Sequence, residues 1–335
     1  MTVIRHRSPS RLAVAVTALL FAAGAAGEPV DAVEGPAYFD RATQAVIEEA
    51  IESLAESQRQ DGSFGEKNPA AITALSMIGF MVNGHVPGQG RYGDAIDNGI
   101  DYLLEVQDEN GYMGSSMYEH GLATLALSEV WGMSEKDDKV KDALKKAVQL
   151  IFHAQNEVGG WRYLPRPQDD DVSVTAMQVV ALASAQQAGI LVPDEVIEKA
   201  IQYLRMCFDP ATGGFNYQPR PYSAAAFPRT AAAVTALMMC GEYDSKEVNA
   251  GVKYLRAEPD EKFAKVGHYA YAHYYAIQVM HRSGEDVFSQ WYPKIRDAWS
   301  AKLKGEGRKK PSAYNTAMAV IVLGAPCRFV PAYQR

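Results

Sequence analysis

The sequence has few cysteines, few β-strand patterns and no linker-like segment. Its three cysteines, Cys207, Cys240 and Cys327, are too few and odd in number for a disulfide framework, so whether any two of them pair stays open. Alternating polar and apolar runs of strand length are nearly absent, which argues against a sheet protein. No stretch rich in proline, glycine and serine divides the chain, and this favours a single folded domain.

The sequence also lacks an excess of basic residues. Its 33 lysines and arginines stand against 40 aspartates and glutamates, which gives a formal net charge of −7. This balance makes nucleic acid an unfavourable partner. No compact spacing of histidine, cysteine and acidic residues predicts a metal site, and no motif points to a cofactor.

The first 26 residues have the pattern of an export signal. Arg5, Arg7 and Arg11 precede an apolar run that ends in Gly24-Ala25-Ala26. The run is about 15 residues long, shorter than the roughly 20 residues that a spanning helix needs. We therefore expect a cleaved signal, a periplasmic or extracellular protein and no transmembrane segment after cleavage. A short segment at 27–40, a helical domain at 41–325 and a tail at 326–335 would follow.

A glutamine–glycine–aromatic pattern recurs along the chain. Its clearest copies are Gln58-Gly62-Phe64, Gln107-Gly111-Tyr112 and Gln155-Gly159-Trp161, and their glycines lie 49 and 48 residues apart. Gly213-Gly214-Phe215 is a later copy with Asp209 in the place of glutamine, and a fifth copy near Tyr254 to Asp260 has lost the glycine. Repeats of this length indicate stacked supersecondary units.

Each repeat combines two kinds of helix. Segments such as 94–106 and 140–154 carry apolar residues on one face and suit an outer layer. Segments such as 172–185 and 230–240 are almost continuously apolar and suit an inner layer. Six inner helices are marked by the pairs Thr73-Ala74, His120-Gly121, Thr175-Ala176, Thr230-Ala231, His273-Tyr274 and Thr316-Ala317. The sequence therefore predicts an all-α fold, an (α/α)6 toroid of two concentric rings.

The glycine turns resemble those of a known superfamily. Together with the run DVSVTAMQVVAL after Trp161, they resemble the repeats of squalene and oxidosqualene cyclases and of protein prenyltransferase β subunits, over roughly residues 45–325. The resemblance implies the toroid and a central cavity for an isoprenoid or other small amphipathic ligand. The glycines suit left-handed helix ends, and we expect the glutamine amides to satisfy backbone groups there.

The resemblance stops short of the reaction. Triterpene cyclases protonate their substrate with an aspartate of a DxDDTA motif, and the matching stretch here, Asp171 to Ala176, keeps only the first acid. Asp169 and Asp170 precede it, and we expect the pKa of at least one of the three carboxyls to be raised. In the alternative interpretation, Asp171 or Ser173 caps the inner helix.

The sequence lacks the residues on which two other chemistries of related toroids depend. Zinc prenyltransferases use an Asp-x-Cys pair and a histidine, and only the histidine has a counterpart here, in His268 or His273. The Gly-Cys-Gly-Glu-Gln stretch of thioester proteins is missing from the sequence. We therefore expect neither metal nor cofactor.

Parallel inner helices would gather their N-terminal residues at one mouth. The expected catalytic residues there are Asp169, Asp170, Asp171 and His120. The expected ligand-binding residues are Tyr118, Glu119, Tyr222, Arg229, His268, Tyr269, Tyr271 and His273.

Three classes of function fit this expectation. The first is a terpenoid-cyclase-like protein that binds an isoprenoid, with or without turnover. The second is an exported polysaccharide lyase or hydrolase, because helical toroids also house such enzymes. The third is a non-catalytic binding or scaffold protein that kept the toroid and lost the chemistry.

Overall fold

The computed structural model describes residues 38–166, 168–219, 224–304 and 311–327. Within these ranges the regular structure is helical, and strand-like pairing is limited to isolated bridges. The predicted export signal lies outside the described residues, as do most of 27–40 and most of the tail. The predicted domain boundaries therefore stay predictions.

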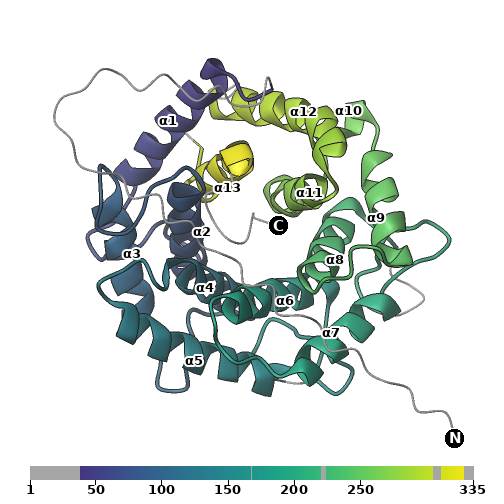
Figure 1. Ribbon diagram of the computed structural model, residues 1–335, viewed down its shortest axis with the longest axis horizontal. Helices are drawn as coiled ribbons and strands as arrows, with labels where there is room; N and C mark the ends of the chain where they lie inside the picture. Colours follow the sequence, from purple (N-terminus) through teal and green to yellow (C-terminus); the bar gives the residue numbers. More distant parts are fainter. Residues whose placement is uncertain (1–37, 167, 220–223, 305–310, 328–335) are drawn as a thin grey trace, which may run out of the picture. The chain divides into compact units, whose positions relative to one another are not determined.

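The helices form two concentric rings (Figure 1). The outer ring consists of α1 (Arg41–Glu56), α3 (Gly93–Glu105), α5 (Asp137–Ala154), α7 (Asp194–Met206), α9 (Lys246–Arg256) and α12 (Glu285–Lys304). The inner ring consists of α2 (Pro69–Val82), α4 (Met117–Val130), α6 (Val172–Gln187), α8 (Phe227–Met239), α11 (Tyr269–Arg282) and α13 (Ala313–Gly324). The short α10 (Asp260–Phe263) precedes α11, and the 3-10 helix η1 (Ala325–Cys327) follows α13.

Contacts close the inner ring. Each inner helix packs against the next one in chain order, and α13 packs back against α2. Outer and inner helices alternate along the chain, so all inner helices run in the same direction. This arrangement confirms the predicted (α/α)6 toroid.

Burial separates the two rings as their sequences predict. In α6 all but a few positions are buried, because the helix has neighbours on both sides and an outer helix behind it. In α3 the buried side chains lie on one face, with Ile96, Ile100 and Leu103 fully covered. Burial of such stripes supplies the main favourable free energy of the fold.

The repeated glutamines connect consecutive repeats. The Gln58 Nε2 atom donates to the Gly62 carbonyl and to the Ala95 carbonyl of the next outer helix, both at 2.9 Å. The next two copies do the same, and their second acceptors are the carbonyls of Ala143 in α5 and Val196 in α7. The glutamine therefore joins its own turn to the following repeat, rather than only satisfying a helix end as expected.

The turn glycines are needed for two reasons. Gly159 has a φ of +95°, a left-handed conformation that costs side-chain-bearing residues energy. A Cβ atom added there would lie 2.2 Å from the Lys199 carbonyl oxygen of the next outer helix. Gly62 and Gly111 make similarly close approaches to Asn98 and Lys146.

A threonine on the inner helix fixes the other side of each turn. The Thr73 hydroxyl accepts the backbone N–H of Phe64 at 2.9 Å, and Thr175 accepts that of Trp161 at 3.0 Å. Thr230 makes the same contact with Phe215. In these three repeats the aromatic residue is thereby held over the start of its inner helix.

Two further features bear on location and covalent structure. None of the helices in the described ranges combines the length and apolarity that a membrane crossing requires. Cys207, Cys240 and Cys327 are free thiols, and Cys207 is buried.

Replacement of Gly159 by alanine tests how much the close approach between repeats contributes. We expect Gly159→Ala to lower the free energy of unfolding by about 2–5 kcal/mol, because strain in φ and overlap with Lys199 add. Gly241→Ala is the matched control, since its φ is +86° but an added Cβ meets nothing within 4 Å. That variant should lose only about 1–2 kcal/mol. Equal losses in urea unfolding would contradict the role of the close approach.

Candidate functional site

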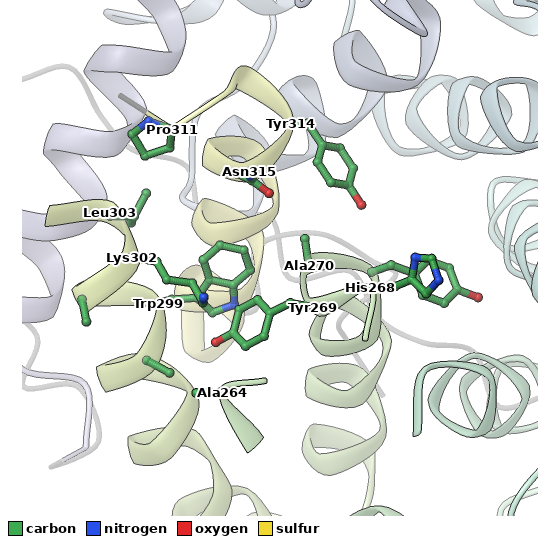
Figure 2. A pocket seen from close by; sticks show the side chains of 13 residues that line it. Ala264, His268, Tyr269, Ala270, Trp299, Lys302, Leu303, Pro311, Tyr314 and Asn315 are labelled. Carbon is green, nitrogen blue, oxygen red and sulfur yellow. The ribbon is translucent and has the colours of Figure 1, made fainter. Parts of the chain in front are cut away.

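The N-terminal turns of the six inner helices surround one end of the ring. Three adjoining cavities lie there, of about 890, 730 and 660 Å³, and Tyr271 and Tyr314 line all three. We call them the central, side and third cavities, in that order of volume. The side cavity lies between the start of α11, the end of α12 and the start of α13 (Figure 2). The shared entrance expected from parallel inner helices is thus present.

Tyrosines dominate the wall of the central cavity. Tyr118 and Tyr271 meet edge to face with ring centroids 6.0 Å apart, and the Tyr118 hydroxyl donates to the Ser173 carbonyl at 3.3 Å. Burial raises the pKa of both phenols above the ordinary value, so they remain neutral hydroxyls. The tyrosines of this wall are Tyr118, Tyr163, Tyr217, Tyr271 and Tyr314.

The charged residues of the central cavity are mostly basic. Arg229, Lys262 and Lys265 line it, and Glu258 is the single carboxylate among its described lining residues. The N-terminal turns of α8 and α11 add partial positive charge from their backbone N–H groups. A locally positive cavity therefore exists in a chain whose net charge is negative.

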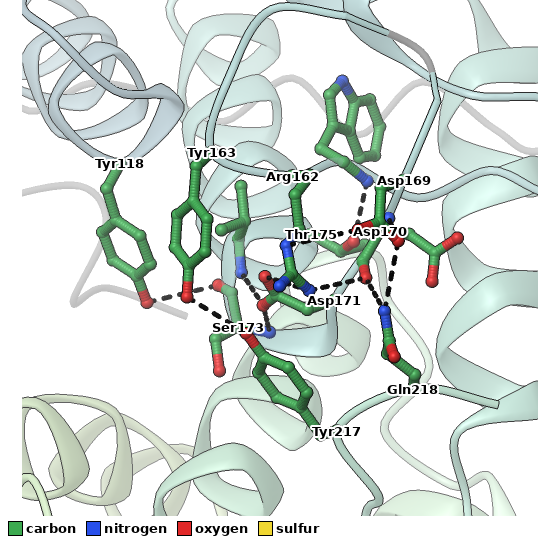
Figure 3. Close-up of polar contacts among 12 residues, drawn as sticks. Tyr118, Arg162, Tyr163, Asp169, Asp170, Asp171, Ser173, Thr175, Tyr217 and Gln218 are labelled. Atoms are coloured by element: carbon green, nitrogen blue, oxygen red, sulfur yellow. Dashed lines mark hydrogen bonds and ion pairs between the residues drawn. The ribbon is translucent and has the colours of Figure 1, made fainter. Parts of the chain in front are cut away.

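Arg162 holds two of these tyrosines in place (Figure 3). Its guanidinium lies 4.9 Å from the ring centroid of Tyr163 and 5.4 Å from that of Tyr217. The two tyrosine hydroxyl oxygens are 3.0 Å apart. No sequence pattern marks Arg162, Tyr163 or Tyr217, because they lie in loops between helices and outside the repeated glutamine–glycine–aromatic turns.

The acidic triplet, Asp169-Asp170-Asp171, holds Arg162 in position. Arg162 forms ion pairs with Asp169 at 3.7 Å and with Asp171 at 3.5 Å. Asp171 is the N-cap of α6, where its Oδ1 atom accepts the N–H groups of Ser173 and Val174 at 2.8 and 2.9 Å. Burial raises the pKa of the Asp171 carboxyl, although the cap bonds and Arg162 oppose the shift. The capping interpretation therefore describes the contacts of Asp171.

The Asp170 carboxylate accepts hydrogen bonds from neighbours away from the cavities. Its Oδ1 atom accepts the Tyr203 hydroxyl at 2.8 Å, and its Oδ2 atom accepts the Asn156 amide at 2.9 Å. Neither Asp170 nor Asp171 lines any of the three cavities. A catalytic role for these carboxylates stays a prediction, and their observed contacts are structural.

His120 and His273 occupy the threonine position of their repeats. The Met113 N–H donates to His120 Nδ1 at 3.2 Å, as Phe64 does to Thr73, and His120 Nε2 lies 3.1 Å from the Ala147 carbonyl oxygen. His273 Nε2 lies 3.2 Å from the Phe263 carbonyl oxygen. Both rings are fully buried, and neither lines a cavity at the entrance.

The other selected residues divide among the cavities. Tyr118, Arg229, His268 and Tyr271 meet at the central cavity. Tyr269 lines the side cavity, and Glu119 lines the third cavity, where it accepts the Ser115 hydroxyl at 2.6 Å. Tyr222 lies outside the described residues.

Two strained residues mark the same entrance. Asn68 and His268 are the N-cap residues of α2 and α11, and each has a φ of 51°. Non-glycine residues adopt this left-handed conformation at an energetic cost, and such strain concentrates at functional sites. His268 is exposed and lines both the central and the side cavity.

Metal coordination finds no support in the described ranges. They contain no group of three or more histidine, cysteine, aspartate or glutamate side chains arranged to hold a metal ion.

Solved structures of several enzymes share this fold. An inactive variant of the α-1,6-mannanase GH76A of Salegentibacter sp. HEL1_6, in complex with α-1,6-mannotriose, superposes with a TM-score of 0.65 at 10% identity, over 86% of this chain and 99% of that one. A sugar epimerase from a ruminal bacterium gives 0.61 at 11% identity, over 84% and 99%. The type II terpene cyclase MstE from Scytonema, in complex with merosterolic acid A, gives 0.56 at 16% identity, over 85% and 97%.

These likenesses establish the fold alone. No family model matches the chain, and no curated protein matches it. The resemblance to squalene cyclases and prenyltransferases therefore holds at the level of the α/α toroid, which mannanases and sugar epimerases share.

The expected isoprenoid or amphipathic ligand requires correction. Two similar mannanase structures hold α-1,6-mannotriose and α-1,6-mannotetrose, not isoprenoids. In this chain the walls of the central cavity do not suit an isoprenoid. Arg229, Lys262 and Lys265 would lose hydration against a hydrocarbon chain without gaining a partner.

The buried histidines predict a pH dependence of stability. Burial lowers the pKa of His120 and of His273 to about 4, whereas histidines of an unfolded chain titrate near ~6.5. Between these values the unfolded chain binds more protons, so stability falls as pH drops from about 6.5 to 4. We expect His120→Thr to remove about 2 kcal/mol of the loss between pH 7 and 5. Urea unfolding at both pH values measures this, and an unchanged loss would refute it.

Proposed function

We propose that the chain is a carbohydrate-active α/α toroid that binds an oligosaccharide in its central cavity. The observation that carries the proposal is the tyrosine wall, which lies at the N-terminal mouth of the inner ring and is interleaved with Arg229 and His268. Mannanases and sugar epimerases with this fold support it.

The wall offers what a sugar ring requires. Tyr163 is about half exposed at its rim, with 47% of its surface accessible, and presents an aromatic face beside a hydroxyl group. Arg162 fixes the orientation of this ring and of Tyr217 from behind, so less side-chain freedom is lost on binding. Apolar faces of a sugar pack on such rings, and its hydroxyl groups bond to the polar edges.

Export fits this function. The predicted signal at residues 1–26 would carry the protein to a compartment where polysaccharides occur. We therefore infer a periplasmic or extracellular site of action.

Hydrolysis is the second candidate function. The inactive mannanase variants lack two consecutive aspartates, and consecutive aspartates also stand at the mouth of this toroid, at 169–171. Glycosidases ordinarily use two carboxyl groups that flank the bond. Glu258 is the one carboxylate among the described residues that line the central cavity, so hydrolysis would require the loop that carries Asp169 and Asp170 to move toward it.

Removal of the Tyr163 ring tests the binding proposal. We expect Tyr163→Ala to weaken oligosaccharide binding at least about tenfold, because the ring face is lost from the cavity rim. Tyr243→Ala is the control, since Tyr243 is 39% exposed and follows the opposite end of α8. Calorimetric titration with α-1,6-mannotriose and an oligosaccharide panel measures both. If no saccharide binds the wild-type protein, the proposal is wrong.

Substitution of the acidic triplet separates hydrolysis from binding. If the chain is a hydrolase, Asp169→Asn, Asp170→Asn and Asp171→Asn together should reduce turnover at least about 100-fold. Asparagine still caps α6, and loss of the two ion pairs to Arg162 should weaken saccharide binding by much less than this factor, because partly exposed ion pairs contribute only about 0–1 kcal/mol each. Reducing-end release and titration are the two measurements, and unchanged turnover would exclude these carboxylates from the reaction.

A further inference from the structure

The side cavity carries buried polar atoms without partners. Tyr269 and Trp299 both line it, and their rings meet edge to face with centroids 5.0 Å apart. The Tyr269 hydroxyl and the Trp299 indole N–H are buried, and neither has a hydrogen-bond partner among the described residues. Trp299 is only 2% exposed. Buried donors of this kind ordinarily have a partner, so both groups are suited to an acceptor that a ligand brings.

Lys302 lies beside these two donors. Its ammonium nitrogen is 4.3 Å from the ring centroid of Tyr269, and Figure 2 shows Tyr269, Trp299 and Lys302 gathered on one side of the cavity. Lys302 forms no ion pair with a described carboxylate, and no carboxylate is among the described residues that line this cavity. The wall is therefore positively charged and rich in donors.

Local packing leaves room at this place. The contact between α11 and α13 is the sparsest in the inner ring, and the repeat that contains α11 has lost the glycine turn. The side cavity lies where these helices diverge, with a volume of about 730 Å³, enough for a sugar residue. His268, Tyr271 and Tyr314 line both this cavity and the central one, so a single oligosaccharide can occupy both.

We propose that the side cavity is a subsite for an anionic sugar residue, whose carboxylate or sulfate group accepts from Trp299 Nε1, Tyr269 Oη and Lys302 Nζ. This inference rests on the proposed saccharide function of the central cavity and names its substrate class. The basic residues of the central cavity extend the same preference, because Arg229, Lys262 and Lys265 outnumber Glu258 there. An acidic oligosaccharide thus meets cations along both cavities.

Trigalacturonic acid and its methyl ester form the matched pair of probes, because they differ in charge and share the sugar chain. A sulfated trisaccharide of the same length is the third probe and distinguishes sulfate from carboxylate recognition. We expect at least about tenfold tighter binding of one anionic probe than of the neutral ester. Equal affinities for all three would overturn the inference while leaving saccharide binding in place.

Substitutions in the side cavity locate the preference. Trp299→Phe and Lys302→Gln should each reduce the affinity for the anionic probe about tenfold and leave that for the ester unchanged. Trp291→Phe is the matched control, because the Trp291 indole N–H is also buried without a partner but lies outside this cavity. Lys304→Gln is the control for charge. A preference that survives both cavity variants would overturn this location.

Two readouts separate binding from stability. Tyr269→Phe removes a hydroxyl without a protein partner, so its urea midpoint should be no lower than that of the wild type, while anion binding weakens. The chain has four tryptophans, and the Trp299 indole N–H signal in a nitrogen–proton correlation spectrum should move on addition of the anionic probe. An unmoved Trp299 signal at saturation would refute the contact. Absence of binding by every probe would instead refute the saccharide function itself.

Discussion

The fold depends on a side-chain amide that bonds to two successive repeats at once. Gln58, Gln107 and Gln155 each donate to their own glycine turn and to a carbonyl of the next outer helix. Three residues further along each of these outer helices, a backbone carbonyl lies so close to the turn glycine that a Cβ atom has no room. Because each contact sets the position of one repeat against the next, three of them in succession determine the curvature of half of the ring.

The later repeats lose this contact, and within the inner ring the packing is sparsest between α11 and α13. Asp209 stands in the place of glutamine and accepts from Ala211 and Thr212 within its own turn. At the corresponding glycine, Gly213, an added Cβ would be 3.4 Å from the next outer helix, an ordinary contact. The fifth turn lacks the glycine entirely, and the central and side cavities lie along the helices that follow these altered turns. Space for a ligand thus lies beside the two altered turns.

The sequence predicted the toroid because the regular spacing of the turn glycines and of the apolar residues follows directly from the repeated backbone structure. The direction of the inner helices followed from their alternation with outer ones, and this brought Tyr118, Arg229, His268 and Tyr271 to one cavity. The histidines show what pattern reasoning missed. His120 and His273 were aligned with Thr73, Thr175 and Thr230, and for His120 that alignment already indicated its structural role as the acceptor of a turn N–H. Arg162, Tyr163 and Tyr217 gave no such signal, because loop residues acquire their neighbours only through the fold.

Unsatisfied groups are distributed unevenly in the described part of the molecule, and this bears on function. Tyr269, His273, Trp291 and Trp299 all lie on α11 or α12 and have buried polar atoms without hydrogen-bond partners. Each such atom costs about 1–3 kcal/mol relative to a bonded one. The repeats at the start of the chain, whose turns are satisfied by glutamine and threonine, contribute fewer such atoms, among them the Tyr112 hydroxyl and the Gln178 amide oxygen. A ligand that supplies acceptors to Tyr269 and Trp299 would gain affinity because these donors are unpaired in the protein. The same unpaired donors lower the stability of the fold, so binding and stability make opposite demands on these residues.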